Sequence, residues 1–258
     1  MTLINKLHST PQNYSDFTVP LNIKASDISI VIPVRNNQEG LDLFLTEFFT
    51  SQNPHIYPKE IIIIDNNSRR PITIDQHFQG NNLSIRLLKC SRNDLASARN
   101  VGINYAKGDW ILFTDSHCLP SESFIEGYLN TKNGSIGYAG NVKAWGKDLL
   151  SKFYDGQERF IPLTMIEQCQ ISRPESLITA NALIWKKALQ QIGGFKQTIR
   201  IPEGADLDLA FRLFQLGQVS YCWQSIVYPN HNKEIPEFIQ RFINDQNSKL
   251  MVSNLYHI

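Results

Sequence analysis

The sequence predicts an α/β protein whose core is a doubly wound, mostly parallel β-sheet. Short apolar runs rich in β-branched residues recur in the first half, at residues 28–33 and 60–65. Runs of this length without polar alternation are typical of parallel strands that are buried on both faces. Segments with helical spacing separate these runs, and strands that alternate with helices favour a parallel sheet.

The first half supports four strands in chain order. Helical spacing follows the first strand, where the apolar residues are Leu41, Phe44, Leu45, Phe48 and Phe49. A third strand is expected at residues 83–88, a helix at 96–106 and a fourth strand at 110–113. These elements complete the alternation on which the parallel sheet depends.

The second half is less regular. Strands are expected at 137–142 and 219–227, with an apolar segment at 177–185, and helices at 148–157, 186–191, 206–216 and 236–251. Gly193 and Gly194 close the short helix, and Gly217 gives a stop signal after Leu216. We therefore divide the chain into an arm at 1–26, one domain at 27–235 with halves at 27–118 and 119–235, and a C-terminal helix at 236–258.

Composition narrows the class of protein. The chain has 258 residues and a formal net charge of +1, so no global field favours nucleic acid or an anionic membrane. Its four cysteines form no Cys-x-x-Cys pair, which argues against a zinc knuckle or a disulfide framework. The N-terminus shows no signal-peptide pattern, and no apolar run approaches the roughly 20 residues of a membrane span. These features predict a cytoplasmic protein without a transmembrane segment.

Polar residues follow three of the predicted strands. These clusters are 35–37, 65–68 and 115–117. In a parallel sheet the carboxyl ends of the strands share one edge, where ligands bind. We therefore expect the three clusters to converge on one site.

The third cluster has the composition of a metal site. Asp115 and His117 are two residues apart, so in extended geometry their side chains point the same way. Oxygen and nitrogen ligands suit manganese better than magnesium. His231, in the loop after residues 219–227, is the candidate third ligand. A polar strand end with a hydrogen-bonded histidine is the competing interpretation.

Five segments in order resemble the nucleotide-diphospho-sugar glycosyltransferases of the GT-A fold, most closely the large inverting family 2. They are residues 28–37, 60–68, 95–109, 180–195 and 204–212, and the resemblance covers residues 27–231. The resemblance implies a nucleotide-sugar half, 27–118, and an acceptor half, 119–235. It also implies a metal-dependent enzyme that moves a sugar from a UDP-sugar to a hydroxyl of a saccharide, lipid-linked or peptide acceptor, with inversion.

The resemblance also implies roles for individual residues. Pro33 and Arg35 would lie along the nucleotide base, Asp65 on the base or ribose, and Arg99 on the base or phosphates. Asp115 would bind ribose and, with His117, the metal. Asp206 would be the catalytic base, a role that needs an ionised carboxylate near the acceptor hydroxyl. Trp145 is the candidate acceptor contact.

Two departures from the family pattern keep alternatives open. The metal motif is Asp-x-His, and Asp115-Ser-His-Cys118 is similar to the polypeptide N-acetylgalactosaminyltransferases, which retain configuration. The usual Glu-Asp pair reads Ala205-Asp206, and Glu203 or Asp208 could supply the missing acid. A retaining transferase and a non-catalytic nucleotide-binding module therefore compete with the inverting enzyme. A nucleotidyltransferase would need an early glycine-rich phosphate loop, which residues 33–40 are not.

Each candidate residue could instead have a purely structural role. Asp65 could cap a helix, and Arg99 could form a surface ion pair. Asp206 and Asp208 could be charges that favour a helix N-terminus. Trp145 could belong to the core, as we expect for Trp110, and Cys118 is expected to pack in the core.

Overall fold

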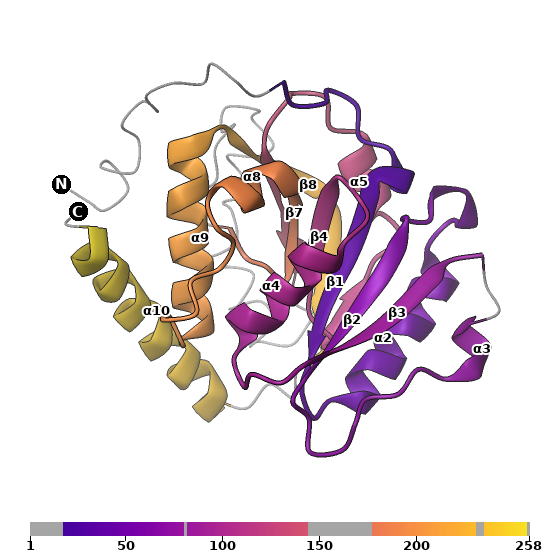
Figure 1. Cartoon of the computed structure of the whole chain (residues 1–258), viewed down its shortest axis with the longest axis horizontal. Coiled ribbons are helices and arrows are strands. Elements are labelled where there is room, and N and C mark those ends of the chain that lie inside the picture. The colour runs from indigo at the N-terminus through magenta and orange to yellow at the C-terminus, as the bar shows by residue number, and fades with distance from the viewer. Residues whose placement is uncertain (1–17, 80–81, 144–176, 231–234, 257–258) are drawn as a thin grey trace.

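The computed structural model describes residues 18–79, 82–143, 177–230 and 235–256. One eight-stranded sheet runs through this part of the chain, in the order β3-β2-β1-β4-β7-β6-β8-β5 (Figure 1). The strands are β1 (Ile28–Val34), β2 (Glu60–Asn66), β3 (Ser84–Cys90), β4 (Trp110–Thr114), β5 (Cys118–Pro120), β6 (Gly137–Val142), β7 (Asn181–Trp185) and β8 (Val219–Pro229).

Helices connect and cover the sheet. The α-helices are α2 (Gln38–Ser51), α3 (Gln76–Gln79), α4 (Leu95–Tyr105), α5 (Glu126–Leu129), α8 (Lys186–Gln191), α9 (Pro202–Leu216) and α10 (Ile235–Tyr256). Short 3₁₀ turns occupy Ala25–Asp27 and Pro54–Ile56. Figure 1 shows α9 and α10 side by side at one end of the molecule.

The first four strands form the parallel half that the sequence predicts. β1 pairs in parallel with β2 on one side and with β4 on the other, and β3 extends the sheet beyond β2. The crossover through α2 runs from β1 to β2, toward the β3 edge of the sheet, and the crossover through α4 runs back from β3 to β4. Because both crossovers are right-handed, α2 and α4 lie on opposite faces of the sheet (Figure 1). The reversal of strand order between β1 and β4 marks the place where such sheets bind ligands.

The other half of the sheet is mixed. β7 runs antiparallel to both β4 and β6, and β5 runs antiparallel to β8, whereas β6 and β8 are parallel. The sheet is therefore mostly parallel, as predicted, with β5 and β7 reversed. The β6–β8 ladder shifts register between Gly140 and Asn141, where β8 bulges.

The start of α9 and the presence of β5 differ from the sequence analysis. Helix α9 begins at Pro202, four residues before the predicted start, because proline is well suited to a first helical turn. The short strand β5 was not predicted, because three residues show no periodicity. The helix expected at 148–157 lies outside the described residues. Trp110 is buried in the core, as predicted.

The glycines after the two helices act by different physical means. Gly193 and Gly194 have φ values of 75° and 66°, which favour glycine and end α8 as predicted. Gly217, in contrast, is extended with φ −174°. A Cβ atom there would lie 2.9 Å from Cδ1 of Ile136, so close packing against Ile136, and not turn geometry, favours glycine here.

Candidate active site

The ends of β1, β2 and β4 converge, as the sequence predicts. The backbone N–H of Asn36 donates to Oγ of Ser68 at 3.0 Å, and the Asn36 amide oxygen accepts from the N–H of Arg69 at 2.8 Å. Nδ2 of Asn37 donates to Oγ of Ser116 at 2.9 Å. Hydrogen bonds thus connect all three polar clusters at one edge of the sheet.

The residues expected along the nucleotide lie on this edge. Pro33 is buried in β1, and Arg35 is exposed directly after the strand. Asp65, near the end of β2, accepts backbone N–H groups from Ser68 at 2.9 Å and Ile72 at 3.3 Å. Asp65 therefore stabilises the loop after β2 through these hydrogen bonds. The alternative that it caps a helix is wrong.

The metal motif forms a tight turn. The N–H of Cys118 donates to the carbonyl of Asp115 at 3.0 Å, so the expectation of extended geometry from Asp115 to His117 is wrong. The turn still brings the side chains together, because ligand atoms of Asp115, His117 and Cys118 all lie within 4.8 Å of one another. Cys118 is fully buried, in agreement with its expected packing role.

Two candidate residues, His231 and Trp145, lie outside the described residues. The chain nevertheless passes beside the metal motif directly before His231. Asn230 donates its N–H to the carbonyl of His117 at 2.6 Å, and Cys118 pairs with Pro229 where β5 meets β8.

Arg99 is the buried cation of the site. It projects from α4, with Nη1 3.1 Å from Oδ1 of Asp206 and Nη2 3.6 Å from Oδ1 of Asp115. Its Cζ lies 5.2 Å from the ring centre of Phe195, a cation–π contact. Nε is buried without a hydrogen-bond partner among the described residues. The alternative of a surface ion pair for Arg99 is therefore wrong.

Asp206 lies in the second turn of α9, whereas the sequence predicts it at the start of the helix. Besides Arg99, its carboxylate accepts two donors from Thr179. The backbone N–H lies 3.0 Å from Oδ2, and the hydroxyl lies 2.7 Å from Oδ1 and 2.9 Å from Oδ2. Burial raises the pKa of the Asp206 carboxyl, the Arg99 charge and Thr179 hydrogen bonds oppose this, and the Asp115 charge adds to it.

Thr179 is a residue of the site that sequence reasoning missed. It is fully buried and stands in a turn directly before β7. The antiparallel pairing of Asn181 with Thr114 could have indicated its position, because it brings residues just before β7 to the end of β4. That pairing joins strands 67 positions apart, and no local pattern encodes it.

A family comparison decides what kind of protein this is. The model of glycosyl transferase family 2 matches residues 29–193, more than half of the chain. The chain belongs to glycosyl transferase family 2. The matched range includes Asp65, Arg99, Asp115 and His117, and it ends before Asp206.

Individual relatives show how far the similarity extends. The chain is 26% identical over 231 residues to "Pre-mycofactocin glycosyltransferase" of Mycobacterium tuberculosis, covering 83% of this chain and 45% of that protein. It is 24% identical over 240 residues to "Putative polypeptide N-acetylgalactosaminyltransferase 13" of Drosophila melanogaster, covering 83% and 42%. The chain thus spans less than half the length of these relatives.

Solved structures of the same fold confirm the GT-A architecture. The structure of GalNAc-T7 with UDP, GalNAc and Mn²⁺ superposes with a TM-score of 0.64 at 19% identity, over 78% of this chain and 43% of that one. At this identity the likeness concerns the fold. In the described part of the family 2 chain, no helix has the length and apolar composition needed to cross a membrane.

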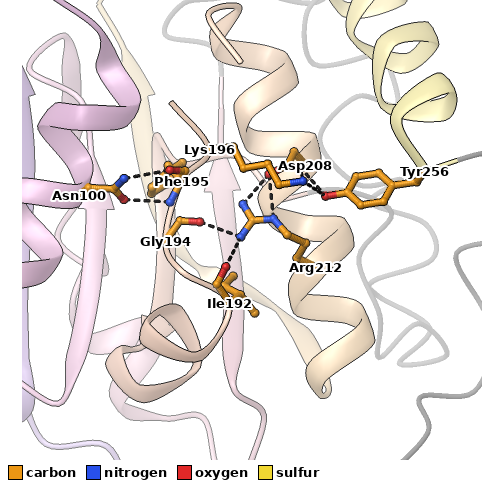
Figure 2. A network of polar contacts seen from close by, with 8 residues as sticks. All are labelled: Asn100, Ile192, Gly194, Phe195, Lys196, Asp208, Arg212 and Tyr256. Carbon is orange, nitrogen blue, oxygen red and sulfur yellow. Dashed lines mark hydrogen bonds and ion pairs between the residues drawn. The ribbon is translucent and has the colours of Figure 1, made fainter. Parts of the chain in front are cut away.

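The second acid of α9 belongs to a separate network, shown in Figure 2. Asp208 is fully buried and binds Nε of Arg212 at 2.9 Å, Nζ of Lys196 at 3.2 Å and the hydroxyl of Tyr256 at 2.6 Å. Arg212 also donates to the carbonyls of Ile192 and Gly194. The prediction that Asp208 supports the helix start is wrong, because it ties α9 to the loop after α8 and to the end of α10.

Proposed function

We propose that this family 2 chain transfers a sugar from a UDP-sugar to a hydroxyl acceptor, with a divalent cation and with inversion at the anomeric carbon. The observation that carries the proposal is the position of Arg99. One guanidinium contacts both Asp115 of the metal motif and Asp206, the candidate base. The donor phosphates and the attacking hydroxyl would thus bind to one connected cluster, formed by Asp115, Arg99 and Asp206.

The donor would occupy the edge where β1, β2 and β4 end. Pro33 and Arg35 would line the base, and Asp65 would accept a hydrogen bond from base or ribose. The buried Nε–H of Arg99 has no partner among the described residues, and a guanidinium suits a diphosphate. The GalNAc-T7 structure was solved with UDP as its nucleotide, which supports UDP here.

Asp115 and His117 would hold the cation, with His231 as third ligand. The donor set fits, because a carboxylate oxygen and an imidazole nitrogen within 4.8 Å of each other can share one ion. We favour Mn²⁺ over Mg²⁺, and Mn²⁺ is also the ion of the GalNAc-T7 structure. When bound, the ion would neutralise charge that develops on the departing diphosphate.

Asp206 would take the proton from the acceptor hydroxyl. An ionised carboxylate offers about four lone-pair positions. Three donors contact it among the described residues, the Arg99 guanidinium, the Thr179 N–H and the Thr179 hydroxyl, and the hydroxyl is shared by both oxygens. The attacking hydroxyl would be the fourth donor. A pKa above the usual aspartate value makes the carboxylate a stronger base. Trp145 is the proposed acceptor contact.

The test is a donor screen with Mn²⁺ present. Release of nucleoside diphosphate is measured from UDP-GlcNAc, UDP-GalNAc, UDP-glucose and GDP-mannose, with simple glycosides as acceptors, and proton NMR reads the anomeric configuration of any product. We expect turnover with one UDP-sugar, inversion, and loss of activity on chelation. A retained product would favour the second candidate, a retaining transferase, which the similarity to the Drosophila relative supports. UDP binding without turnover of any donor would favour the non-catalytic module.

A matched pair of histidine variants separates the metal from general stability. His117→Ala should weaken Mn²⁺ binding, measured by calorimetry, and lower turnover together. His55→Ala, an exposed position in the 3₁₀ turn Pro54–Ile56, should change neither. Equal Mn²⁺ affinity in both variants would remove His117 from the metal site.

A further inference from the structure

We propose that Thr179 is the positioning residue of the base: it fixes the plane of the Asp206 carboxylate so that one lone pair faces the acceptor. The inference rests on the proposed function, because it gives Asp206 a catalytic role. It assigns Thr179 a role that the family resemblance did not supply.

The contacts constrain Asp206 at both oxygens. The Thr179 N–H holds Oδ2 at 3.0 Å, and Arg99 holds Oδ1 at 3.1 Å. The Thr179 hydroxyl has one proton, and it lies between the oxygens at 2.7 Å and 2.9 Å. Rotation of the carboxylate about its final bond would lengthen hydrogen bonds at both oxygens at once, including the shared one.

Thr179 is itself held firmly. It stands in a turn that closes through the N–H of Asn181 and the carbonyl of Ile178 at 3.0 Å. The buried Asn181 side chain accepts from the hydroxyl of Tyr128 and donates to the carbonyls of Asn141 and Ser225. Every polar atom of this amide is therefore used, so the turn has a fixed anchor.

The sheet transmits this position to the metal motif. Asn181 pairs with Thr114 across the antiparallel β4–β7 ladder, and Asp115 follows Thr114 directly. Thr179 enters β7 at the same end of the sheet at which Asp115 leaves β4. The register therefore sets where Thr179 holds Asp206 relative to Asp115, and so relative to the donor phosphates.

The hydroxyl can be removed while the backbone donor stays. Thr179→Val has nearly the same shape and keeps the N–H, whereas Thr179→Ser keeps both donors. We expect Thr179→Val to lower kcat about ten-fold or more, since it removes a hydrogen bond to a charged group. The KM for the donor and the Kd for UDP should stay within about two-fold, because Thr179 would not touch the nucleotide. Thr179→Ser should restore kcat.

The decisive measurement combines Thr179→Val with Asp206→Asn, using the UDP-sugar identified by the screen. If Thr179 acts through Asp206, the valine should have no further effect on kcat in the Asp206→Asn background. Thr50→Val is the matched control, because the Thr50 hydroxyl donates to a helix carbonyl on α2. Unchanged UDP affinity confirms that each variant is folded, and Thr179→Ala, which also keeps the backbone donor, replaces the valine variant if that one does not fold.

Each outcome has a separate meaning. Full activity in Thr179→Val, a failure of serine to rescue, or additive losses in the double variant would overturn the positioning role while leaving the transferase proposal intact. Normal turnover in Asp206→Asn would instead overturn the base assignment, and with it the role of Thr179. An unmodified chain that turns over no donor would overturn the proposed function itself.

Discussion

Helix α9 has two acidic faces with opposite surroundings. Asp206 and Asp208 are two residues apart, so their side chains diverge by about 200° around the helix axis. Asp206 lies next to Arg99 and Thr179, which supply three hydrogen-bond donors to its carboxylate. Asp208 faces away, fully buried among Arg212, Lys196 and Tyr256. One helix thus carries the proposed base and an acid that ties α9 to the loop after α8 and to the end of α10.

The contrast teaches that burial alone does not identify a catalytic carboxylate. Asp208 is the more deeply buried of the two, but cations and a hydroxyl occupy its oxygens. Asp206 has fewer partners and opens toward the metal motif. The useful criterion is the free acceptor capacity that remains after the hydrogen bonds are counted.

The largest expected effect is on turnover at the Asp206 face. Asp206→Asn should lower kcat by about 10²–10⁴, the usual loss of general-base assistance. UDP affinity and thermal stability should change little, because Arg99 keeps Asp115 as an anion 3.6 Å away and an amide can still accept from Thr179. Steady-state kinetics measure kcat, and calorimetry measures the affinity for UDP. If kcat stays near normal with inversion intact, Glu203 becomes the base candidate.

Replacing Asp208, on the opposite face of α9, should lower the stability of the protein. Asp208→Asn removes the buried anion that pairs with Arg212, and breaking a buried pair costs about 3–5 kcal/mol of unfolding free energy. Urea denaturation of Asp208→Asn measures this loss, and the exposed Asp75→Asn is the control. A stable Asp208→Asn variant with strongly reduced kcat would reverse the assignment of the two faces.

The pH dependence of kcat tests the role of Asp206. Because its folded-state pKa is raised above 3.8, the base becomes protonated at a higher pH than an ordinary aspartate as the pH falls. The acid limb of kcat should therefore lie above that value. Protonation of His117 would produce a similar limb by releasing the metal, but that limb should shift with Mn²⁺ concentration. A limb that moves with Mn²⁺ would assign the dependence to the metal site.

The smallest effect is expected at the end of α10. Tyr256→Phe removes the hydrogen bond to Asp208 and the one donated by Lys196, and should cost about 1.5–3 kcal/mol of unfolding free energy, with kcat unchanged. The ring keeps its contact with Phe211, whose ring centre lies 4.1 Å away. A kcat loss in this variant, seen in the same assay as for Asp206→Asn, would show that the two faces are coupled.

The parallel half was predictable because its information is local. Buried strands such as β1 and β2 are continuous apolar runs, and the polar residues after them mark the edge where they meet. The convergence of Asn36, Ser68 and Ser116 followed from parallel geometry alone.

The acceptor half was predicted less well because its geometry depends on distant pairing. The reversal of β7, the bulge in β8 and the turn at Asp115–Cys118 have no local signature. The Arg99–Asp206 contact spans 107 residues, and the partners of Asp208 come from three segments. The sequence pattern identified Asp206 and Asp208 as candidates, but it could not predict which residues surround each of them.

The continuous sheet also determines how the protein responds to heat. Because β4 and β7 share a ladder of five residue pairs, the nucleotide side and the base side share one core. We therefore expect the two halves of the sheet to unfold together as one cooperative unit. A nucleotide that binds only at the ends of β1, β2 and β4 therefore stabilises Asp206 and Asp208 equally, through mass action and without touching either.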